Sequence, residues 1–499
     1  MLFNSLQFLF FFPVVTLIYF IIPSKVKYLW LLISSYYFYM CWNAKYALLM
    51  LFSTAVTYVC SLMIEAVKEQ AWEEDKKIKY KKYIVVLSLI LNLSVLGYFK
   101  YTNFLIDLLV NALGRIHIAA HIPKFDILLP VGISFYTFQA LSYTMDVYRG
   151  DVYAEKNFFR YALFVSFFPQ LVAGPIERSK NLLRQLASPK QFSFDNTRKG
   201  FLLMLWGYFL KVVLADRIAY FVDTVYGYYS DFDGLILVAA TVLFAFQIYC
   251  DFYGYSVIAT GAAKVLGIDL MENFHSPYLT FSVAEFWRRW HISLTSWFKD
   301  YLYFPLGGSR KGKIRKYVNK MVVFLVSGLW HGAGFSFVVW GLLNGLYQII
   351  EEVLKPLRMK LPEHLKIRKE NVFYKAVQLV MTFILVDFAW IFFRANSITD
   401  AVHIIRRMLT VDMTSFSNFA GNLYAVGMYK SECIVIFVSL LVLLFSDICK
   451  CKNISIIQKI TETPWFVQSA WVVVAICTIL VFGIWGPEYN QANFIYFQF

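Results

Sequence analysis

The chain has 499 residues, of which 59% are hydrophobic, 19% aromatic and only 16% charged. A soluble domain has about 25% charged and about 45–50% apolar residues, so this composition excludes an ordinary water-soluble protein. The net charge of +15 does not indicate a nucleic-acid partner, because the basic residues lie in short loops between apolar runs. The seven cysteines are odd in number and form no C-x-x-C pair, so we expect no disulfide framework and no bound metal.

Apolar runs recur along the whole chain, many of them near the roughly 17–25 residues that a helix needs to cross a bilayer core. They lie at 6–22, 28–42, 46–64, 83–101, 128–147, 158–173, 199–215, 234–262, 318–350 (room for two helices), 373–394, 433–447 and 466–486. Some must be partial or re-entrant, so we predict an all-α multi-pass membrane protein with about ten or eleven crossings. Boundaries at Gly132, Gly174 and Gly332 predict broken helices, which are tolerated only inside protein or beside a cavity. No repeat or linker is seen, so residues 1–499 are expected to form one membrane domain.

The placement of lysines predicts which loops face the cytoplasm. Lys25 and Lys27 follow the first run, and a lysine cluster at 68–82 follows the third. Basic loops stay on the cytoplasmic side, so the N-terminus is expected outside. Lysines at 450–459 precede the last run and no basic residue follows it, so the tail 487–499 is also expected outside.

The segment 282–308 is an unusual mixture of aromatic and charged residues. Ser282 and Glu285 form the capping box of a predicted helix. One face of this helix carries apolar residues four positions apart: Trp290, Leu294 and Phe298. Cationic or proton-accepting residues interrupt it: Arg288, Arg289, His291 and Lys299. Such a helix is too polar to span, which favours an interfacial or re-entrant position with aromatics at headgroup depth. A surface helix that only anchors the fold is the alternative.

A basic run follows this segment: Arg310, Lys311, Lys313, Arg315, Lys316 and Lys320. A run of this kind marks the cytoplasmic side of any membrane protein. It would also attract a phosphate-bearing molecule. The run alone does not decide between these interpretations.

His331 lies within the glycine-rich apolar segment 324–335. If a helix leaves the cytoplasmic surface near Lys320, His331 lies roughly 16 Å deep, near the middle of a core about 30 Å thick. An ionisable side chain at that depth is costly and indicates a functional site. Glycines at 328, 332 and 334 would let a backbone or a substrate approach closely. The alternative is a neutral histidine that is hydrogen-bonded between helices.

Asp251 is a second ionisable residue within an apolar run. It is expected either to have an Arg or His partner or to be protonated. A structural or orienting role is favoured over a catalytic one.

These segments resemble the signatures of the membrane-bound O-acyltransferase (MBOAT) family. The first signature is similar to EFWRRWHISL (285–294) with DYLYFPLGG (300–308), and the second to SGLWHGAG (327–334). Further agreement occurs in LPVGISFYTFQ (129–139), LVAGPIE (171–177) and DFYGYS (251–256). The resemblance covers essentially the whole chain and is densest at 128–349. The most similar branch contains the bacterial alginate and peptidoglycan O-acetyltransferase subunits, and the teichoic-acid D-alanylation enzyme is a more distant relative.

The resemblance implies a ring of tilted helices around a tunnel in a bacterial cell membrane. His331 corresponds to the catalytic histidine of the family, and His291 to its second conserved polar position. The donor would be a cytoplasmic thioester, acetyl-CoA or an acyl-carrier protein, and no permanently bound cofactor is expected. Arg288, Arg289, Lys311 and Lys313 are then candidate donor-binding residues. The expected acceptor is an envelope polysaccharide outside, served by an extracytoplasmic esterase-like (SGNH-type) partner.

The C-terminal residues also resemble a known motif, the F-x-Y-x-x-F terminus of the small companion protein in D-alanylation. Phe494, Tyr496 and Phe499 occupy its three positions, so Tyr496 is a candidate acyl relay. The nine residues from Pro487 to Tyr496 reach roughly 30 Å when extended. Because mid-membrane lies only about 15 Å from the surface, Tyr496 can reach the depth of His331. An aromatic interfacial anchor is the alternative.

The expected chemistry is acyl transfer with His331 as general base. His291 is expected to polarise the thioester carbonyl or to help hold the acceptor. Two other activities stay open: a teichoic-acid-type D-alanyl transferase, and a transporter or flippase without acyl chemistry. A transporter often has two related halves, whereas both histidine motifs of this chain lie in one half.

Overall fold

The computed structural model describes residues 1–118, 122–126, 128–172, 174–188, 190–364, 371–485 and 494–495, and every regular element in these ranges is a helix. The described chain forms two compact units. The first comprises Met1–Met204 with Ser256–Met271, and the second comprises Leu205–Tyr255 with Glu272–Phe499. The predicted all-α architecture is confirmed, while the prediction of one membrane domain stays a prediction.

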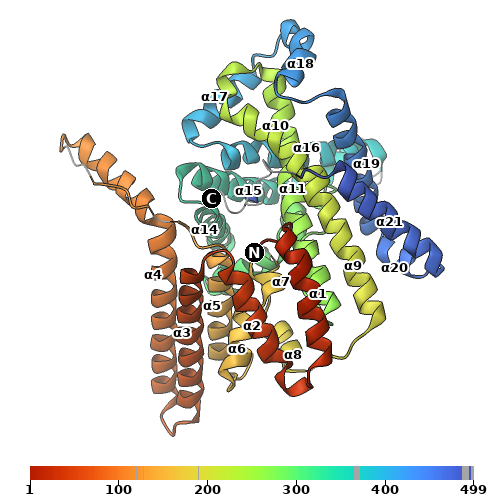
Figure 1. Cartoon of the computed structure of the whole chain (residues 1–499). Coiled ribbons are helices and arrows are strands. Elements are labelled where there is room, and N and C mark those ends of the chain that lie inside the picture. The colour runs from red at the N-terminus through yellow and green to blue at the C-terminus, as the bar shows by residue number, and fades with distance from the viewer. Residues whose placement is uncertain are drawn as a thin grey trace. The chain divides into compact units, whose positions relative to one another are not determined.

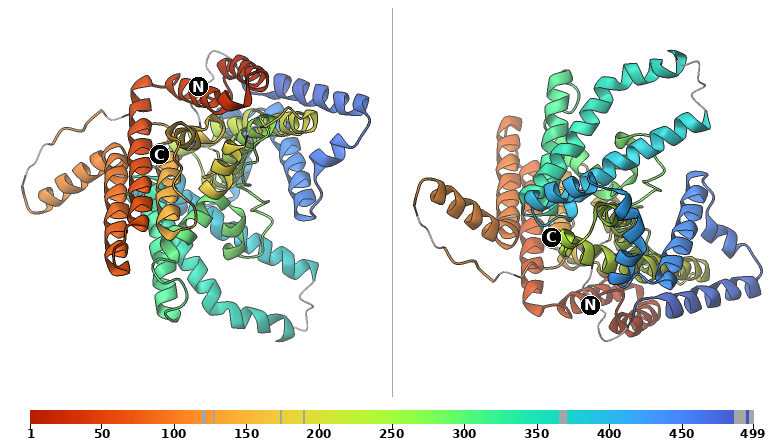
Figure 2. Two further views of the ribbon diagram at one scale, coloured as in Figure 1. Left: turned by 90° about the horizontal axis from the view of Figure 1, so that it is seen from below. Right: turned by 90° about the horizontal axis from the view of Figure 1, so that it is seen from above.

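The first unit is built mainly from the N-terminal helices. They are α1 (Leu6–Ile21), η1 (Ser24–Val26), α2 (Lys27–Met40), α3 (Ala44–Glu69), α4 (Glu74–Arg115), α5 (Ile133–Arg149), α6 (Phe158–Ser166), α7 (Phe168–Leu171) and α8 (Ser179–Ala187). The Asn43 side chain caps α3 by accepting a hydrogen bond from the Lys45 N–H. Helix α3 runs beside α4 and also packs against α5 (Figures 1 and 2).

Two helix breaks of the first unit fall at the predicted glycines. Gly132 precedes α5 in the left-handed conformation, with φ of +74°, and a Cβ there would lie 2.5 Å from the Leu171 carbonyl oxygen. Gly174 lies between α7 and α8, where a Cβ would overlap the backbone of Gln170. Only glycine fits these two close approaches, so the predicted breaks are confirmed.

The second unit contains the C-terminal helices. They are η3 (Tyr229–Asp231), α12 (Val283–Arg289), α13 (Ile292–Phe298), η4 (Lys299–Tyr303), α14 (Lys313–His331), α15 (Phe335–His364), α16 (Val372–Arg394), α17 (Ile398–Met408), α18 (Met413–Ala425), α19 (Lys430–Cys451), α20 (Ile456–Thr461) and α21 (Trp465–Phe482). Helix α9 (Phe194–Tyr208) continues through the π-helix η2 (Phe209–Ala215) into α10 (Asp216–Gly227), and α11 (Gly234–Val265) follows. Helix α14 packs along α15, and α15 packs along α16 (Figure 2).

Seven helices of the described residues are long and apolar enough to cross a membrane: α3, α4, α11, α15, α16, α19 and α21. Helix α1 is also apolar but has 16 residues. Large apolar side chains such as Phe10, Phe437 and Val474 are exposed on these helices, as expected where lipid covers the protein. The multi-pass character is thus confirmed, and the number of crossings stays a prediction.

The single helix predicted to begin at Ser282 is wrong. The Ser282 hydroxyl does accept a hydrogen bond from the Glu285 N–H, but α12 ends at Arg289. A second short helix, α13, starts at Ile292, and His291 between them has a left-handed backbone with φ of +44°. Trp290 therefore does not continue a stripe with Leu294 and Phe298. Trp290 is 1% exposed and stacks on Phe286, so it packs in the protein core, and its depth in the membrane stays a prediction.

Candidate active site

His331 is the last residue of α14, at a corner where the chain turns into α15. Two glycines bring these helices into backbone contact: a Cβ on Gly328 would overlap the Phe337 carbonyl, and one on Gly341 would overlap that of Phe324. Gly332 is the extended residue that caps the end of α14, and a side chain there would collide with the Phe337 ring. The expectation of close backbone approach around His331 is confirmed at Gly328. At Gly332 the close neighbour is the Phe337 ring, and a Cβ on Gly334 would meet nothing closer than 3.6 Å.

The hydrogen bond of His331 fixes the tautomer of its neutral ring. Nδ1 lies 2.7 Å from the carbonyl oxygen of Ser327, one helical turn earlier. A carbonyl oxygen only accepts hydrogen bonds, so Nδ1 must carry the proton and donate it. In the neutral imidazole, Nε2 then carries the lone pair. This is the protonation pattern of a general base.

Aromatic rings surround the imidazole of His331. Their centroids lie 4.8 Å away for Trp330, 4.9 Å for Trp340 and 5.4 Å for Phe393. Trp340 in turn stacks on Trp390. His331 itself is 4% exposed, so its ring is held in one orientation within an apolar box.

His291 is held by Asn273. The Asn273 Oδ1 atom lies 3.1 Å from His291 Nδ1 and also accepts hydrogen bonds from the Ser293 N–H and hydroxyl. The Asn273 carbonyl oxygen accepts from the Ile292 N–H at 2.9 Å. Side chain and main chain of one asparagine thus stabilise the left-handed turn at His291, a conformation that is strained in a residue with a side chain. Asn273 was not among the predicted site residues.

The structure brings His291 and His331 together beside Trp330. The Trp330 ring lies 6.0 Å from the His291 ring and 4.8 Å from the His331 ring. Burial lowers the pKa of His291 well below its ordinary value, and the neighbouring His331 lowers it further. His291 is therefore neutral, and its Nδ1–H donates to Asn273.

The four candidate donor-binding residues lie in two places. Arg288 is exposed on α12, and its neighbour Arg289 pairs with Glu285 at 2.6 Å. Lys311 and Lys313 are exposed at the start of α14, the end opposite His331. A helix of this length puts Lys313 roughly 27 Å from His331, so these lysines do not touch the histidine site.

Glu352 was not predicted as a partner of the basic run. It pairs with Lys316 and, at 2.6 Å, with Lys320, which ties the start of α14 to α15. The carboxylate raises the pKa of Lys316 above its ordinary value, chiefly through this hydrogen bond. Two of the six basic residues therefore have a structural role.

The predicted type of partner for Asp251, an arginine or a histidine, is wrong. Asp251 pairs with Lys211 of η2, at 2.6 Å, and not with an arginine or a histidine. Tyr496, the predicted acyl relay, and Phe499 lie outside the described residues. Phe494 and Ile495 are described and buried.

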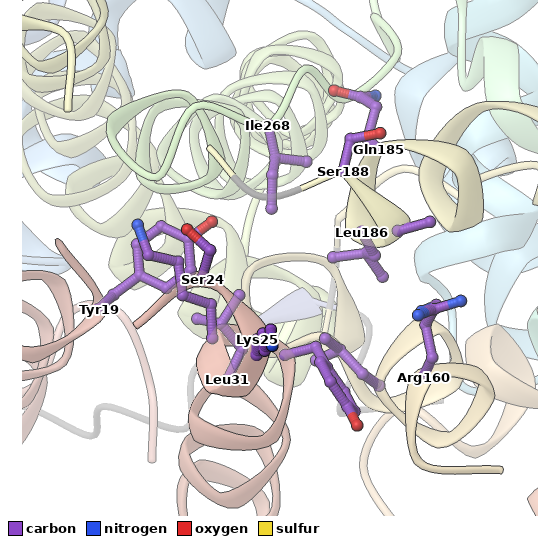
Figure 3. A pocket seen from close by; sticks show the side chains of 13 residues that line it. Tyr19, Ser24, Lys25, Leu31, Arg160, Gln185, Leu186, Ser188 and Ile268 are labelled. Atoms are coloured by element: carbon purple, nitrogen blue, oxygen red, sulfur yellow. The ribbon is translucent and has the colours of Figure 1, made fainter. Parts of the chain in front are cut away.

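A pocket in the first unit is separate from these residues (Figure 3). It lies between α2, α6 and α8, and basic and polar side chains such as Lys25, Arg160 and Gln185 line it. None of the predicted site residues is among its lining. The histidine pair of the second unit is thus the better candidate for the reaction centre.

The model of the membrane-bound O-acyltransferase family, MBOAT, matches residues 38–386, which include both histidines and Asp251. The chain belongs to this family. It is therefore a membrane O-acyltransferase, and the enzyme class inferred from the motifs is confirmed.

Several bacterial proteins are similar to this MBOAT chain. It is 31% identical to the peptidoglycan O-acetyltransferase of Helicobacter pylori, over 100% of this chain and 98% of that protein. It is 36% identical to the probable alginate O-acetylase AlgI of Pseudomonas aeruginosa, over 82% of this chain and 75% of that one. It is 28% identical to the teichoic acid D-alanyltransferase of Bacillus subtilis, over 46% of this chain and 60% of that protein.

Proposed function

We propose that this MBOAT protein transfers an acetyl group from a cytoplasmic thioester, across a bacterial cell membrane, toward an envelope polysaccharide outside. The peptidoglycan and alginate O-acetylating relatives support acetyl transfer to a polysaccharide. The D-alanyltransferase relative covers less than half of this chain, which makes D-alanyl transfer the second candidate.

The observation that carries the proposal is the Nδ1–H donated by His331 to the Ser327 carbonyl, which leaves Nε2 as the base. His331 Nε2 takes the proton of an attacking hydroxyl as that oxygen bonds to the thioester carbonyl carbon. The carbon–sulfur bond then breaks, and the proton passes from His331 to the departing thiolate. The products are an oxygen ester and a free thiol, and His331 regains its neutral form.

His291 holds the attacking hydroxyl in this proposal. Because its Nδ1–H is directed to Asn273, the Nε2 lone pair of the neutral ring can only accept a hydrogen bond. A hydroxyl can donate to it, whereas a thioester carbonyl has no proton to give. The hydroxyl has a single proton, so it donates to His291 while the acceptor binds and turns to His331 Nε2 for the attack. Of the two roles expected for His291, positioning of the acceptor is therefore favoured over polarising the carbonyl.

Tyr496 supplies the attacking hydroxyl in the first transfer. Its phenol oxygen bonds to the acetyl carbon, its proton goes through His331 to the thiol, and an acetyl-tyrosine ester results. In a second transfer a polysaccharide hydroxyl attacks this ester and the phenol is restored. An extracytoplasmic SGNH-type esterase-like partner would catalyse that second step.

The basic residues at the start of α14 and on α12 would meet the donor from the cytoplasm. Arg288, Lys311 and Lys313 are exposed cations, and they would attract the phosphates of acetyl-CoA or of an acyl-carrier prosthetic group. The roughly 27 Å between Lys313 and His331 fits a long donor whose thioester end reaches the histidines while its phosphates stay in water.

Transfer of labelled acetyl groups in sealed membrane vesicles tests the proposal. Vesicles with the partner protein and polysaccharide on the outward face receive labelled acetyl-CoA on the cytoplasmic face. Label should appear in the polysaccharide with the native chain and with His403→Ala, a control on the exposed face of α17, but not with His331→Ala. Transfer of D-alanine in place of acetyl would favour the second candidate. Unmodified passage of the donor without ester formation would indicate a transporter.

A further inference from the structure

The C-terminal end of the chain is fastened to the helix break η2. Near the last helix, the Ile484 N–H donates to the Val212 carbonyl at 3.0 Å, and Arg217 donates to the Phe482 carbonyl at 2.5 Å. Further along, the Ile495 N–H donates to Asp251 Oδ2 at 2.8 Å. The tail is thus hydrogen-bonded at two points: Ile484 bonds to η2 itself, and Ile495 bonds to Asp251, the ion-pair partner of Lys211 in η2.

The second of these points is a buried ion cluster. Lys211 lies 2.8 Å from Asp216 and 2.6 Å from Asp251, and the three side chains are at most 5% exposed. One ammonium faces two buried carboxylates here, and a buried carboxylate is stabilised by each hydrogen-bond donor that reaches it. The Ile495 main-chain N–H provides such a donor.

The π-helix explains how these ions come together. The wider turn at Phe209–Ala215 carries Lys211, and π-helical turns occur frequently at functional sites. Gly254 lets α11 approach it, because a Cβ there would lie 2.9 Å from the Gly207 carbonyl and 3.1 Å from the Lys211 nitrogen. This contact sets Asp251 opposite Lys211. Neither the base nor its aromatic box uses the cluster.

Phe494 links the cluster to the histidine site. Its fully buried ring lies 4.6 Å from the Tyr255 ring, 6.3 Å from the Phe252 ring and 5.9 Å from the Lys211 ammonium. Phe252 also contacts the His291 ring, edge to face, at 4.7 Å. The residue two positions before Tyr496 therefore shares an aromatic neighbour with His291.

We propose that Lys211, Asp216 and Asp251 form a clamp that grips the main chain of the C-terminal tail at Ile495, and that the acyl relay by the next residue, Tyr496, depends on this grip. This inference depends on the acyl relay proposed for Tyr496, and it adds how the tail that carries the relay is held. The three ions are positioning residues, since they hold the relay without touching the acyl group. The clamp recognises a main-chain N–H, and the Phe494 ring fills the site beside it.

Ile495→Pro tests the clamp without changing its ions, because proline lacks the N–H that Asp251 accepts. The readout is amide hydrogen exchange of the C-terminal peptide, by mass spectrometry, in the full-length protein in lipid nanodiscs. Exchange should become about tenfold to a hundredfold faster, as expected when one hydrogen bond to a charged acceptor is lost. Ile495→Val keeps the N–H and should keep the slow exchange. Equal exchange in Ile495→Pro and the native chain would overturn the clamp.

The positioning role is tested by the kinetics of acetyl transfer. Ile495→Pro should lower kcat about tenfold to a hundredfold, the same factor as for amide exchange. The KM for acetyl-CoA should not change, because the donor-binding residues are unaltered. Phe494→Ala removes a ring but no ion, so it should lower kcat by a smaller factor. This variant replaces Ile495→Pro as the test if the proline variant does not fold. A freed tail with native kcat would contradict the positioning role.

Tyr496→Phe separates the clamp from the relay, because it removes the phenol and keeps the Ile495 N–H. Loss of transfer in Tyr496→Phe together with native transfer in Ile495→Pro would overturn the clamp and leave the relay standing. Native transfer in Tyr496→Phe would overturn the relay, and the positioning role of the clamp with it.

Discussion

His331 Nδ1 donates a hydrogen bond of 2.7 Å to the carbonyl oxygen of Ser327, the residue one helical turn before it. This contact assigns the proton of the neutral ring to Nδ1 and the lone pair to Nε2. It also holds the ring at the end of α14, where the chain breaks at Gly332. Because Ser327 and His331 both belong to α14, this hydrogen bond does not itself link two helices.

The tautomer of His331 is the first prediction. Solid-state NMR of the protein with nitrogen-labelled histidine, with His331 identified by its loss in His331→Ala, should show a protonated Nδ1 and an unprotonated Nε2 at neutral pH. A proton on Nε2 instead would remove the base from the proposed mechanism.

Asn273→Ala is expected to impair the reaction more than the fold. It removes the oxygen that accepts from His291 and Ser293, so the left-handed turn at His291 loses its support. We expect kcat to fall about tenfold to a hundredfold, with little change in the KM for the donor. The matched control is Asn344→Ala, which removes another buried asparagine, the partner of the Trp287 indole. If the two variants lose stability and activity in parallel, Asn273 is merely structural.

Gly328→Ala is expected to destabilise the protein. The new methyl would overlap the Phe337 carbonyl and force α14 away from α15, at a cost of about 1–3 kcal/mol. Gly97→Ala on α4 is the control, because a Cβ there meets nothing within 4 Å. That change should be neutral or stabilise by about 0.5–1 kcal/mol. Thermal unfolding in detergent measures both, and a neutral Gly328→Ala would contradict the observed contact of the two helices.

The paired variant Lys311→Gln/Lys313→Gln is expected to weaken donor binding. Loss of two cations should raise the KM for acetyl-CoA about threefold to tenfold at low salt and leave kcat unchanged. Added salt should shrink the difference, because it screens the charges. Lys452→Gln, in a basic loop elsewhere, is the control. An unchanged KM would mean that the basic run sets membrane orientation alone.

The sequence predicts the long helices well, because lipid demands long apolar runs. Runs at 46–64, 234–262 and 433–447 became α3, α11 and α19. Helices α3 and α19 extend beyond the run at both ends and α11 at its C-terminal end, and each extension includes a charged residue. Gly132 and Gly332 mark real breaks, since each lies where a side chain would collide with neighbouring backbone or ring atoms.

The site is predicted less completely, because its supports come from outside the motifs. Periodicity from Ser282 predicts one helix, whereas the turn at His291 depends on hydrogen bonds that Asn273, which precedes the segment, accepts. Likewise the partner of Asp251 is Lys211, forty positions earlier, brought close by a π-helical turn that no residue pattern announces. Both histidines were predicted from their motifs, and their common neighbour Trp330 is seen only in the structure.

Acetyl transfer by purified His331→Gln protein tests the role of His331 most directly. Glutamine retains an N–H donor and similar polarity, but its amide nitrogen cannot take a proton. With thermal unfolding equal to that of the native chain, the initial rate of transfer from labelled acetyl-CoA should fall by about 10²–10⁴. A rate within about threefold of the native rate, well below the usual contribution of a general base, would contradict the assignment of His331 as the base.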